Sequence, residues 1–215
     1  MGSTTFDVYT VVDIFLLLLI GIGPKIALVP YLDATRDMDY AAKRFVTRTM
    51  LVTAGTVGVV LLVLGRLLTK LLHFSTGALS IAGGLILVLI AVAMVRGPTD
   101  QDTKEQLAGR DPKEIAVFPL AVPYLLNPAG IVVLVTVSAE AGSFGHIAIV
   151  FAVTAVVLAL DVAVFRWANR ISDHLDEGRM LVTEKVFGFL LAALAVQLVL
   201  NGLDAVGVIH LVSGH

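Results

Sequence analysis

The chain has 215 residues, of which 58% are hydrophobic and 15% charged, whereas soluble domains average about 45–50% and about 25%. That excess of apolar residues predicts an integral membrane protein. The absence of cysteine excludes disulfides and thiolate-bound metals. The net charge of −2 argues against a nucleic-acid partner.

Six apolar stretches follow one another along the chain. Each is close to the length of about 20 residues with which a helix crosses the hydrocarbon core of a bilayer, and none alternates as a membrane strand would. They are Val11–Tyr31, Phe45–Leu64, Thr76–Val95, Ile115–Val137, Ile147–Phe165 and Val186–Leu203. The sequence therefore predicts an all-α integral membrane fold with six transmembrane helices.

Basic residues gather in the connections after the first, third and fifth predicted helices. The opposite side of the membrane receives only Arg66 and Lys70. The positive-inside rule then places the three basic connections in the cytoplasm and both termini on the outer, periplasmic side of a cytoplasmic (inner) membrane. Tyr31 and Trp167 lie near the ends of their spans, where an aromatic belt is expected.

The two halves of the chain resemble each other. Ile22–Pro24 corresponds to Leu126–Pro128 with an offset of 104 residues. At an offset of 105 residues, Gly83 and Gly97 correspond to Gly188 and Gly202. Gly and Pro are common in transmembrane helices, so chance matches are the alternative interpretation.

A duplication would divide the single membrane domain into a first repeat at residues 1–95, a cytoplasmic linker at 96–114 and a second repeat at 115–215. Because each repeat holds an odd number of helices, the two copies would have opposite topologies in the membrane. Inverted repeats are typical of secondary transporters, whose substrate lies near the midplane between the repeats.

Proline and glycine interrupt the first and fourth predicted helices near their centres. Such breaks leave carbonyl and N–H groups without helical partners, and these groups can bind a polar solute. We therefore predict a substrate site at Gly23, Pro24, Asn127, Pro128 and Gly130. Gln197, one turn before Asn201 on the sixth helix, is a further candidate. The alternative for the two breaks is a pair of ordinary kinks satisfied by neighbouring helices.

Two charges fall inside the predicted spans. Asp161 stands among apolar residues, and an intramembrane carboxylate suggests a functional site. Lys25 follows the first break at a similar predicted depth, so we predict that the two pair or share a proton as a coupling site. The alternatives are that Lys25 extends to the surface and that local water solvates Asp161. The stripe Ala155, Ala159 and Ala163, roughly opposite Asp161, is predicted to contact another helix.

Several motifs resemble the MarC family in order along most of the chain. They are Ile81–Leu87 with Ala91–Met94, Ile115–Pro123 running into Asn127–Gly130, Ala139–Gly142, and Leu194–Leu203. The resemblance implies a six-helix inner-membrane protein related to small neutral amino acid transporters and, more distantly, to the lysine-exporter superfamily. The chain departs from the family at Gly23–Ile26, where Asn-Pro-x-Gly is usual and where Lys25 adds a charge.

These observations predict a secondary transporter of a small polar solute, such as a neutral amino acid, with proton coupling. A passive channel and a membrane scaffold without transport activity are the alternatives. The sequence offers no activated nucleophile, metal-ligand set or phosphate loop, so we expect no enzyme activity, no cofactor and no metal. The expected partners are the solute and the lipid bilayer. The sequence is also compatible with a homo-oligomer.

Overall fold

The computed structural model describes residues 8–96, 110–140, 144–171 and 177–210. Within them the chain is almost entirely helical. Four helices belong to the first half: α1 (Val8–Gly21), α2 (Pro24–Ala34), α3 (Tyr40–Leu72) and α4 (Thr76–Arg96). The second half contains α6 (Pro112–Ile115), the segment η1 (Ala116–Leu125), α7 (Pro128–Glu140), α8 (Phe144–Ile171) and α9 (Glu177–Ala205).

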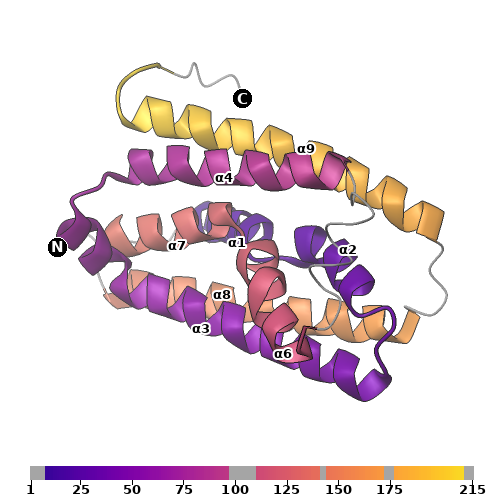
Figure 1. The fold of residues 1–215 in the computed structure, drawn as a ribbon. Helices are drawn as coiled ribbons and strands as arrows, with labels where there is room; N and C mark the ends of the chain where they lie inside the picture. The colour runs from indigo at the N-terminus through magenta and orange to yellow at the C-terminus, as the bar shows by residue number, and fades with distance from the viewer. Residues whose placement is uncertain (1–7, 97–109, 141–143, 172–176, 211–215) are drawn as a thin grey trace.

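The helices form three layers (Figure 1). The pair α4 and α9 makes one outer layer, and the pair α3 and α8 makes the other. The shorter elements α1, α2, η1 and α7 lie between them and contact both layers. The larger hydrophobic core lies between the middle layer and the α3–α8 pair, so the short elements are the most enclosed part of the molecule.

Four helices are long and apolar enough to cross a membrane by length and composition: α3, α4, Gly145–Arg170 of α8 and Lys185–Ala205 of α9. They correspond to the second, third, fifth and sixth predicted spans. The first predicted span is divided into α1 and α2, and the fourth into α6, η1 and α7. The predicted breaks in these two spans are therefore confirmed, and neither span is a continuous helix.

The fourth predicted span departs from helix well before its break. Phe118 and Val122 are extended, with φ and ψ of −140° and 123° and of −134° and 124°. Each precedes a proline, Pro119 or Pro123, whose ring disfavours the helical conformation of the residue before it. The prediction of one helix over Ile115–Val137 is wrong for this reason, and α7 begins only at Pro128.

Small residues bring α4 and α9 together in antiparallel orientation. Gly77 lies against the carbonyl of Gly202, and Gly84 lies against the carbonyl of Ala195. A Cβ on Gly84 would lie 2.8 Å from that carbonyl oxygen, so the approach requires a residue without a side chain. On each helix the small residues of this contact are seven positions apart, so they lie on the one face that packs against the partner helix.

Corresponding elements of the two halves share the same spacing. Two pairs of element bounds are each 104 residues apart: Gly21 and Leu125, and Pro24 and Pro128. The packing repeats as well, because α3 contacts η1 as α8 contacts α1, and α4 contacts α7 as α9 contacts α2. Each contact between two elements is thus repeated by the corresponding elements of the other half.

Candidate site at the crossing of two helix breaks

The two helix breaks meet at the centre of the molecule. Ile22 and Leu126 form an antiparallel bridge, in which the Gly23 N–H donates to the Leu125 carbonyl at 3.3 Å and the Asn127 N–H donates to the Gly21 carbonyl at 2.9 Å. Because the two bridged residues are themselves 104 positions apart, each hydrogen bond is the counterpart of the other. Two interrupted helices thus pair backbone to backbone at a single point.

Glycine makes this crossing possible. A Cβ on Gly21 would overlap the backbone of Gly130, and a Cβ on Gly130 would overlap the carbonyl of Gly21. Only a chain without side chains at both positions can approach so closely. Gly130 was predicted as part of the candidate site, but its contact with Gly21 was not predicted.

Asn127 connects both breaks through its side chain, which is 1% exposed. Its Oδ1 accepts from the Gly130 N–H at 3.1 Å, so it caps the N-terminus of α7. Its Nδ2 donates to the Ile20 carbonyl at 2.7 Å, at the end of α1. Pro128 follows as the first residue of α7, where its missing N–H removes no hydrogen bond.

The backbone groups at the breaks were predicted to be available to a solute, and in this conformation they are not. The carbonyls of Gly21 and Leu125 accept across the crossing, and those of Leu18 and Ala121 accept from within their own segments. Gly23, Pro128 and Gly130 are buried and Pro24 is half-buried. The structure brings these predicted site residues together, with Asn127, in a closed arrangement.

Gln197 lies in a different environment from the crossing. Its side chain is exposed on α9, and its Nε2 donates to Asn201 Oδ1 one turn later at 2.7 Å. The two amides satisfy part of each other's hydrogen-bonding capacity on an exposed helix face. Their predicted spacing on one face is therefore confirmed, whereas a contact of Gln197 with a solute stays a prediction.

The predicted pair of Lys25 and Asp161 is not formed. Asp161 is 0% exposed, and neither of its carboxylate oxygens has a hydrogen-bond partner in the described part of the chain. Lys25 is exposed because Ile26, Ala27 and Val29 take the inward face of α2. Similar depth along two helices did not determine which way the lysine points.

The face of α8 that carries Asp161 is the one buried in the bundle. Thr154, Asp161 and Phe165 are all buried, whereas the alanine stripe of Ala155, Ala159 and Ala163 is exposed. The predicted contact through that stripe is therefore wrong. Asp161 sits on the face that α8 turns toward α1, α2 and α3, and Thr154 shares this buried face.

Sequence analysis missed a polar cluster that joins α2, α3 and α8. The Tyr31 hydroxyl donates to Asn169 Oδ1 and lies 2.8 Å from the Thr47 hydroxyl, and Asn169 Nδ2 donates to Thr47 at 3.1 Å. Tyr31 is fully buried, so its prediction as an interfacial aromatic is wrong. Its ring packs edge-on against Phe165 at 5.1 Å between centroids. Single polar residues in separate spans gave no pattern that could have linked them.

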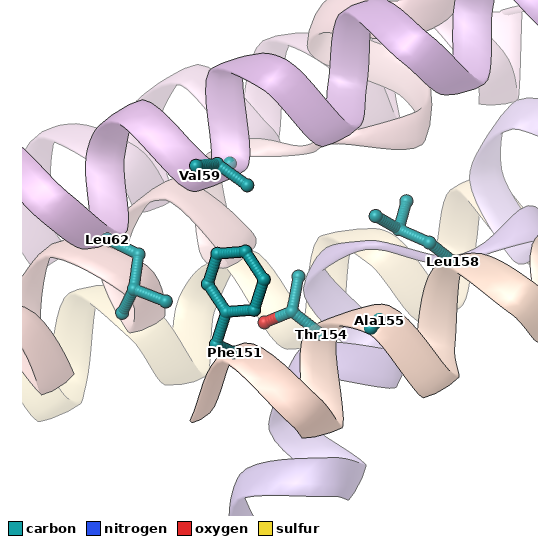
Figure 2. A pocket seen from close by; sticks show the side chains of 7 residues that line it. Val59, Leu62, Phe151, Thr154, Ala155 and Leu158 are labelled. Carbon is teal, nitrogen blue, oxygen red and sulfur yellow. The ribbon is translucent and has the colours of Figure 1, made fainter. Parts of the chain in front are cut away.

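A small cavity of about 50 Å³ lies between α3 and α8. Its lining is apolar apart from Thr154, whose hydroxyl donates to the Val150 carbonyl at 2.7 Å. Figure 2 shows Phe151, Thr154 and Leu158 of α8 on one side and Val59 and Leu62 of α3 on the other. The cavity is too small for an amino acid, and its walls would hold water only weakly.

Comparison with known proteins identifies the family. Residues 8–206 match the MarC family of integral membrane proteins. The chain belongs to the MarC family. It is 28% identical over 204 residues to the membrane protein YvbG of Bacillus subtilis, covering 93% of this chain and 94% of that one. It is 26% identical over 214 residues to the membrane protein YhcE of Escherichia coli, covering 96% and 97%.

The inner membrane protein MarC of Salmonella arizonae is 28% identical over 151 residues, which cover 64% of this chain and 68% of that protein. No solved structure matches the chain. Membership of the MarC family confirms the resemblance seen in the sequence and the assignment as a multi-pass integral membrane protein. It places the crossing of the two breaks inside a membrane domain.

The crossing contains backbone amides, backbone carbonyls and the Asn127 amide, whereas Asp161 is a buried acid on α8. Within the described residues, no three His, Cys, Asp or Glu side chains lie close enough together to hold a metal ion. The groups present can bind a solute that both donates and accepts hydrogen bonds.

Proposed function

We propose that this protein is a secondary transporter of a small polar solute, with a neutral amino acid as the first candidate. The observation that carries the proposal is the pairing of two broken helices through equivalent backbone groups inside a membrane protein. Discontinuous helices that meet between repeats are the usual architecture of a transporter's central site. The other features of the molecule add to this argument.

An inverted repeat is part of the proposal. The common spacing of 104 residues in the element bounds supports it, as does the exchange of packing partners between the halves. The counterparts α4 and α9 run antiparallel, since Gly77 meets Gly202 whereas Gly188 meets Met94. A two-fold axis in the membrane plane would relate helices in this way. On this proposal α1–α2 and α6–η1–α7 are the broken first members of two triplets of spans.

The proposed orientation has both termini on the outer side of a cytoplasmic membrane. The distribution of basic residues supports it through the positive-inside rule. The similarity to an inner membrane protein of Salmonella arizonae supports the choice of membrane. The ends of the bundle are accordingly called outer, where α3 ends and α8 begins, and cytoplasmic, where α3 begins and α8 ends.

The proposed solute site is the crossing in a more open conformation. The carboxylate of an amino acid would accept from the N–H groups of Gly23 and Asn127, and its ammonium group would donate to the carbonyls of Gly21 and Leu125. These four groups now satisfy one another, so the solute would replace the contacts between the repeats that close the crossing. A rocking motion of one repeat against the other needs bonds of this exchangeable kind. Pro24, Pro128 and Gly130 would shape the walls, and Gln197 would meet the solute along its way.

The proposal assigns the coupling role to Asp161 without Lys25. A buried carboxylate without a partner is costly when it is charged. Ionisation therefore favours a conformation in which the carboxylate is solvated or paired. The charge on Asp161 would then bias one facing of the repeats over the other, as coupling requires.

Uptake into proteoliposomes tests the proposal. We expect purified protein to accumulate one or more labelled neutral amino acids, with saturation, when a pH gradient is imposed. Asp161→Asn should lose accumulation driven by the gradient, whereas Asp37→Asn, which changes an exposed carboxylate in the α2–α3 connection, should retain it. Flux without saturation would indicate a passive facilitator. The absence of flux for every neutral amino acid, with and without the gradient, would contradict the proposed function.

A further inference from the structure

The buried face of α8 places an unpartnered acid between two unlike environments. Asp161 is 0% exposed and both of its carboxylate oxygens lack a hydrogen-bond partner. One turn toward the cytoplasmic end stands Phe165, followed by Asn169 in the polar cluster. One turn toward the outer end stands Leu158, at the edge of the cavity. An unpaired charge in this position would be costly, so the acid needs a ligand that neutralises it.

The surroundings of Asp161 select the chemical class of that ligand. A hard metal cation takes about six or more oxygen ligands, and within the described residues neither oxygen of this carboxyl group has a hydrogen-bond partner. A proton needs a single oxygen. Bonding to one carboxylate oxygen removes the charge and leaves a neutral acid that the apolar surroundings tolerate far better.

Among the side chains that the structure describes, no ionisable group on a neighbouring element is hydrogen-bonded to Asp161. On α2, Lys25 is exposed and Tyr31 is engaged in the polar cluster. On α3, Lys43 lies beyond the contact of Thr47 with Asn169. Tyr9 and Asp13 occur in the first turns of α1, and Glu140 is the last residue of α7. On α8 itself, His146 precedes Asp161 by four turns, and Arg166 and Arg170 are exposed.

The cytoplasmic side of Asp161 is closed by hydrogen bonds. Tyr31, Thr47 and Asn169, which we call the latch, connect α2, α3 and α8. The Tyr31 ring contacts Phe165 at an interplanar angle of 72°. The ring contact and the latch therefore stand on the cytoplasmic side of Asp161 along this face of α8. A proton could leave toward the cytoplasm only after these hydrogen bonds separate.

The outer side is closed in a different way. The positions 104 residues from Tyr31, Thr47 and Asn169 are Val135, Phe151 and Gly65. Gly65 packs tightly against Val135 and Ser138, and the Ser138 hydroxyl accepts one hydrogen bond from the Arg66 N–H at 3.0 Å. Phe151 lines the cavity beside Thr154 and Leu158. The two ends of the same helix pair therefore differ in how they are closed.

We propose that Asp161 is a proton-binding site that is loaded from the outer end and closed toward the cytoplasm by the latch of Tyr31, Thr47 and Asn169. Its role in coupling rests on the proposed function, whereas its capacity to bind a proton does not. A proton from outer water forms the O–H bond at Asp161, and the same proton leaves when the latch opens.

Infrared difference spectroscopy of the full chain in lipid vesicles tests the site. Between acidic and alkaline buffer, we expect a carboxylic-acid C=O band that shifts in heavy water and is absent from Asp161→Asn. Replacing potassium by sodium should leave the band unchanged. Asp161→Leu should lose the same band, and Asp37→Asn should keep it. A wild-type spectrum lacking this band, or a band removed by sodium, would overturn the proposal.

The latch is tested by the rate at which the Asp161 band shifts when heavy water is supplied from one side. Tyr31→Phe keeps the ring and removes the hydroxyl, so exchange from the cytoplasmic side should become roughly tenfold faster, as loss of about one net hydrogen bond allows. Tyr40→Phe, at an exposed tyrosine, should leave the rate unchanged. Equal rates from both sides in the wild type would overturn one-sided access.

The two proposals fail separately. Amino acid uptake without an Asp161 band would contradict the proton site and leave transport standing. An Asp161 band in a protein that moves no neutral amino acid would contradict the proposed function and leave the proton site standing.

Discussion

At the scale of single residues, Asn127 and Asp161 represent two opposite uses of a buried polar side chain. Asn127 uses both ends of its amide, one to cap α7 and one to reach the last turn of α1. Asp161 has the same degree of burial and no hydrogen-bond partner in the described part of the chain. A polar group that stabilises the fold has its partners in place, whereas a group kept for a ligand does not. Substitution should separate these roles.

Asn127→Ala should lower the free energy of unfolding by about 2 kcal/mol, because it removes a helix cap and leaves the partly buried Ile20 carbonyl without its donor. Thermal unfolding in detergent measures the change. The matched control is Asn201→Ala on the exposed face of α9, which should cost less than about 0.5 kcal/mol. Equal stability of the two variants would show that the Asn127 side chain is not needed for the crossing.

Asp161→Leu should unfold at the same temperature as the wild type or higher. The substitution breaks no hydrogen bond, and it removes a buried polar group whose lack of a partner costs on the order of 1–3 kcal/mol. The unfolding temperature in detergent, measured alongside Asp161→Asn, gives the sign. A loss of several degrees in both variants would assign Asp161 a structural partner and contradict its role as a free acid.

The sequence was sufficient to find Asp161, because a charge within an apolar helix stands out whatever it contacts. It was not sufficient to find the partner. Depth along a helix follows from counting residues, but direction around the helix depends on which face the bundle buries. Lys25 is exposed and does not pair with Asp161. The prediction for Tyr31 failed in the opposite sense. Its position near a helix end predicted an exposed side chain, but its hydroxyl is buried against Thr47 and Asn169.

At the scale of elements, the breaks were predictable and their meeting was not. Proline and glycine indicate an interrupted helix from the local sequence alone, because proline lacks a backbone N–H and glycine lacks a side chain. The contact of Gly21 with Gly130 joins residues from different halves of the chain. The irregular course of η1 had a local signal in Pro119 and Pro123, which the apolar run around them concealed.

Gly21→Ala should destabilise the protein by roughly 3 kcal/mol or more, because its Cβ would meet backbone atoms of Gly130 that cannot move aside. Gly58→Ala on α3 is the control. The nearest atom to its Cβ would be the flexible Leu134 Cδ1 at 3.4 Å, and alanine favours a helix over glycine by about 1 kcal/mol. Unfolding in detergent should therefore rank Gly58→Ala at or above the wild type, and the reverse ranking would contradict the close crossing.

At the scale of the whole molecule, the proposed repeat connects separate observations. The two hydrogen bonds at the crossing are counterparts of each other, equivalent helices pack against each other in both outer layers, and the latch is a clear asymmetry between the halves. The sequence predicted the repeat from the shared Pro motifs, and its offset of 104 residues recurs in the element bounds. The glycine pairs offset by 105 residues are less informative, because Gly97 lies outside the described residues.

The topology of the repeats yields the last prediction, which the natural absence of cysteine makes direct. Single cysteines at Asp37 and Arg110, both exposed in connections on the basic side, should react with a membrane-impermeant maleimide only in inverted vesicles. Cysteines at Leu72 and Val208, 61% and 67% exposed, should react only in intact spheroplasts. Six crossings with both ends of the membrane domain outside require this pattern. Labelling of Leu72→Cys and Val208→Cys from opposite sides would exclude the inverted repeat, and labelling of all four positions on the reversed sides would keep the repeat but invert the proposed direction of proton entry.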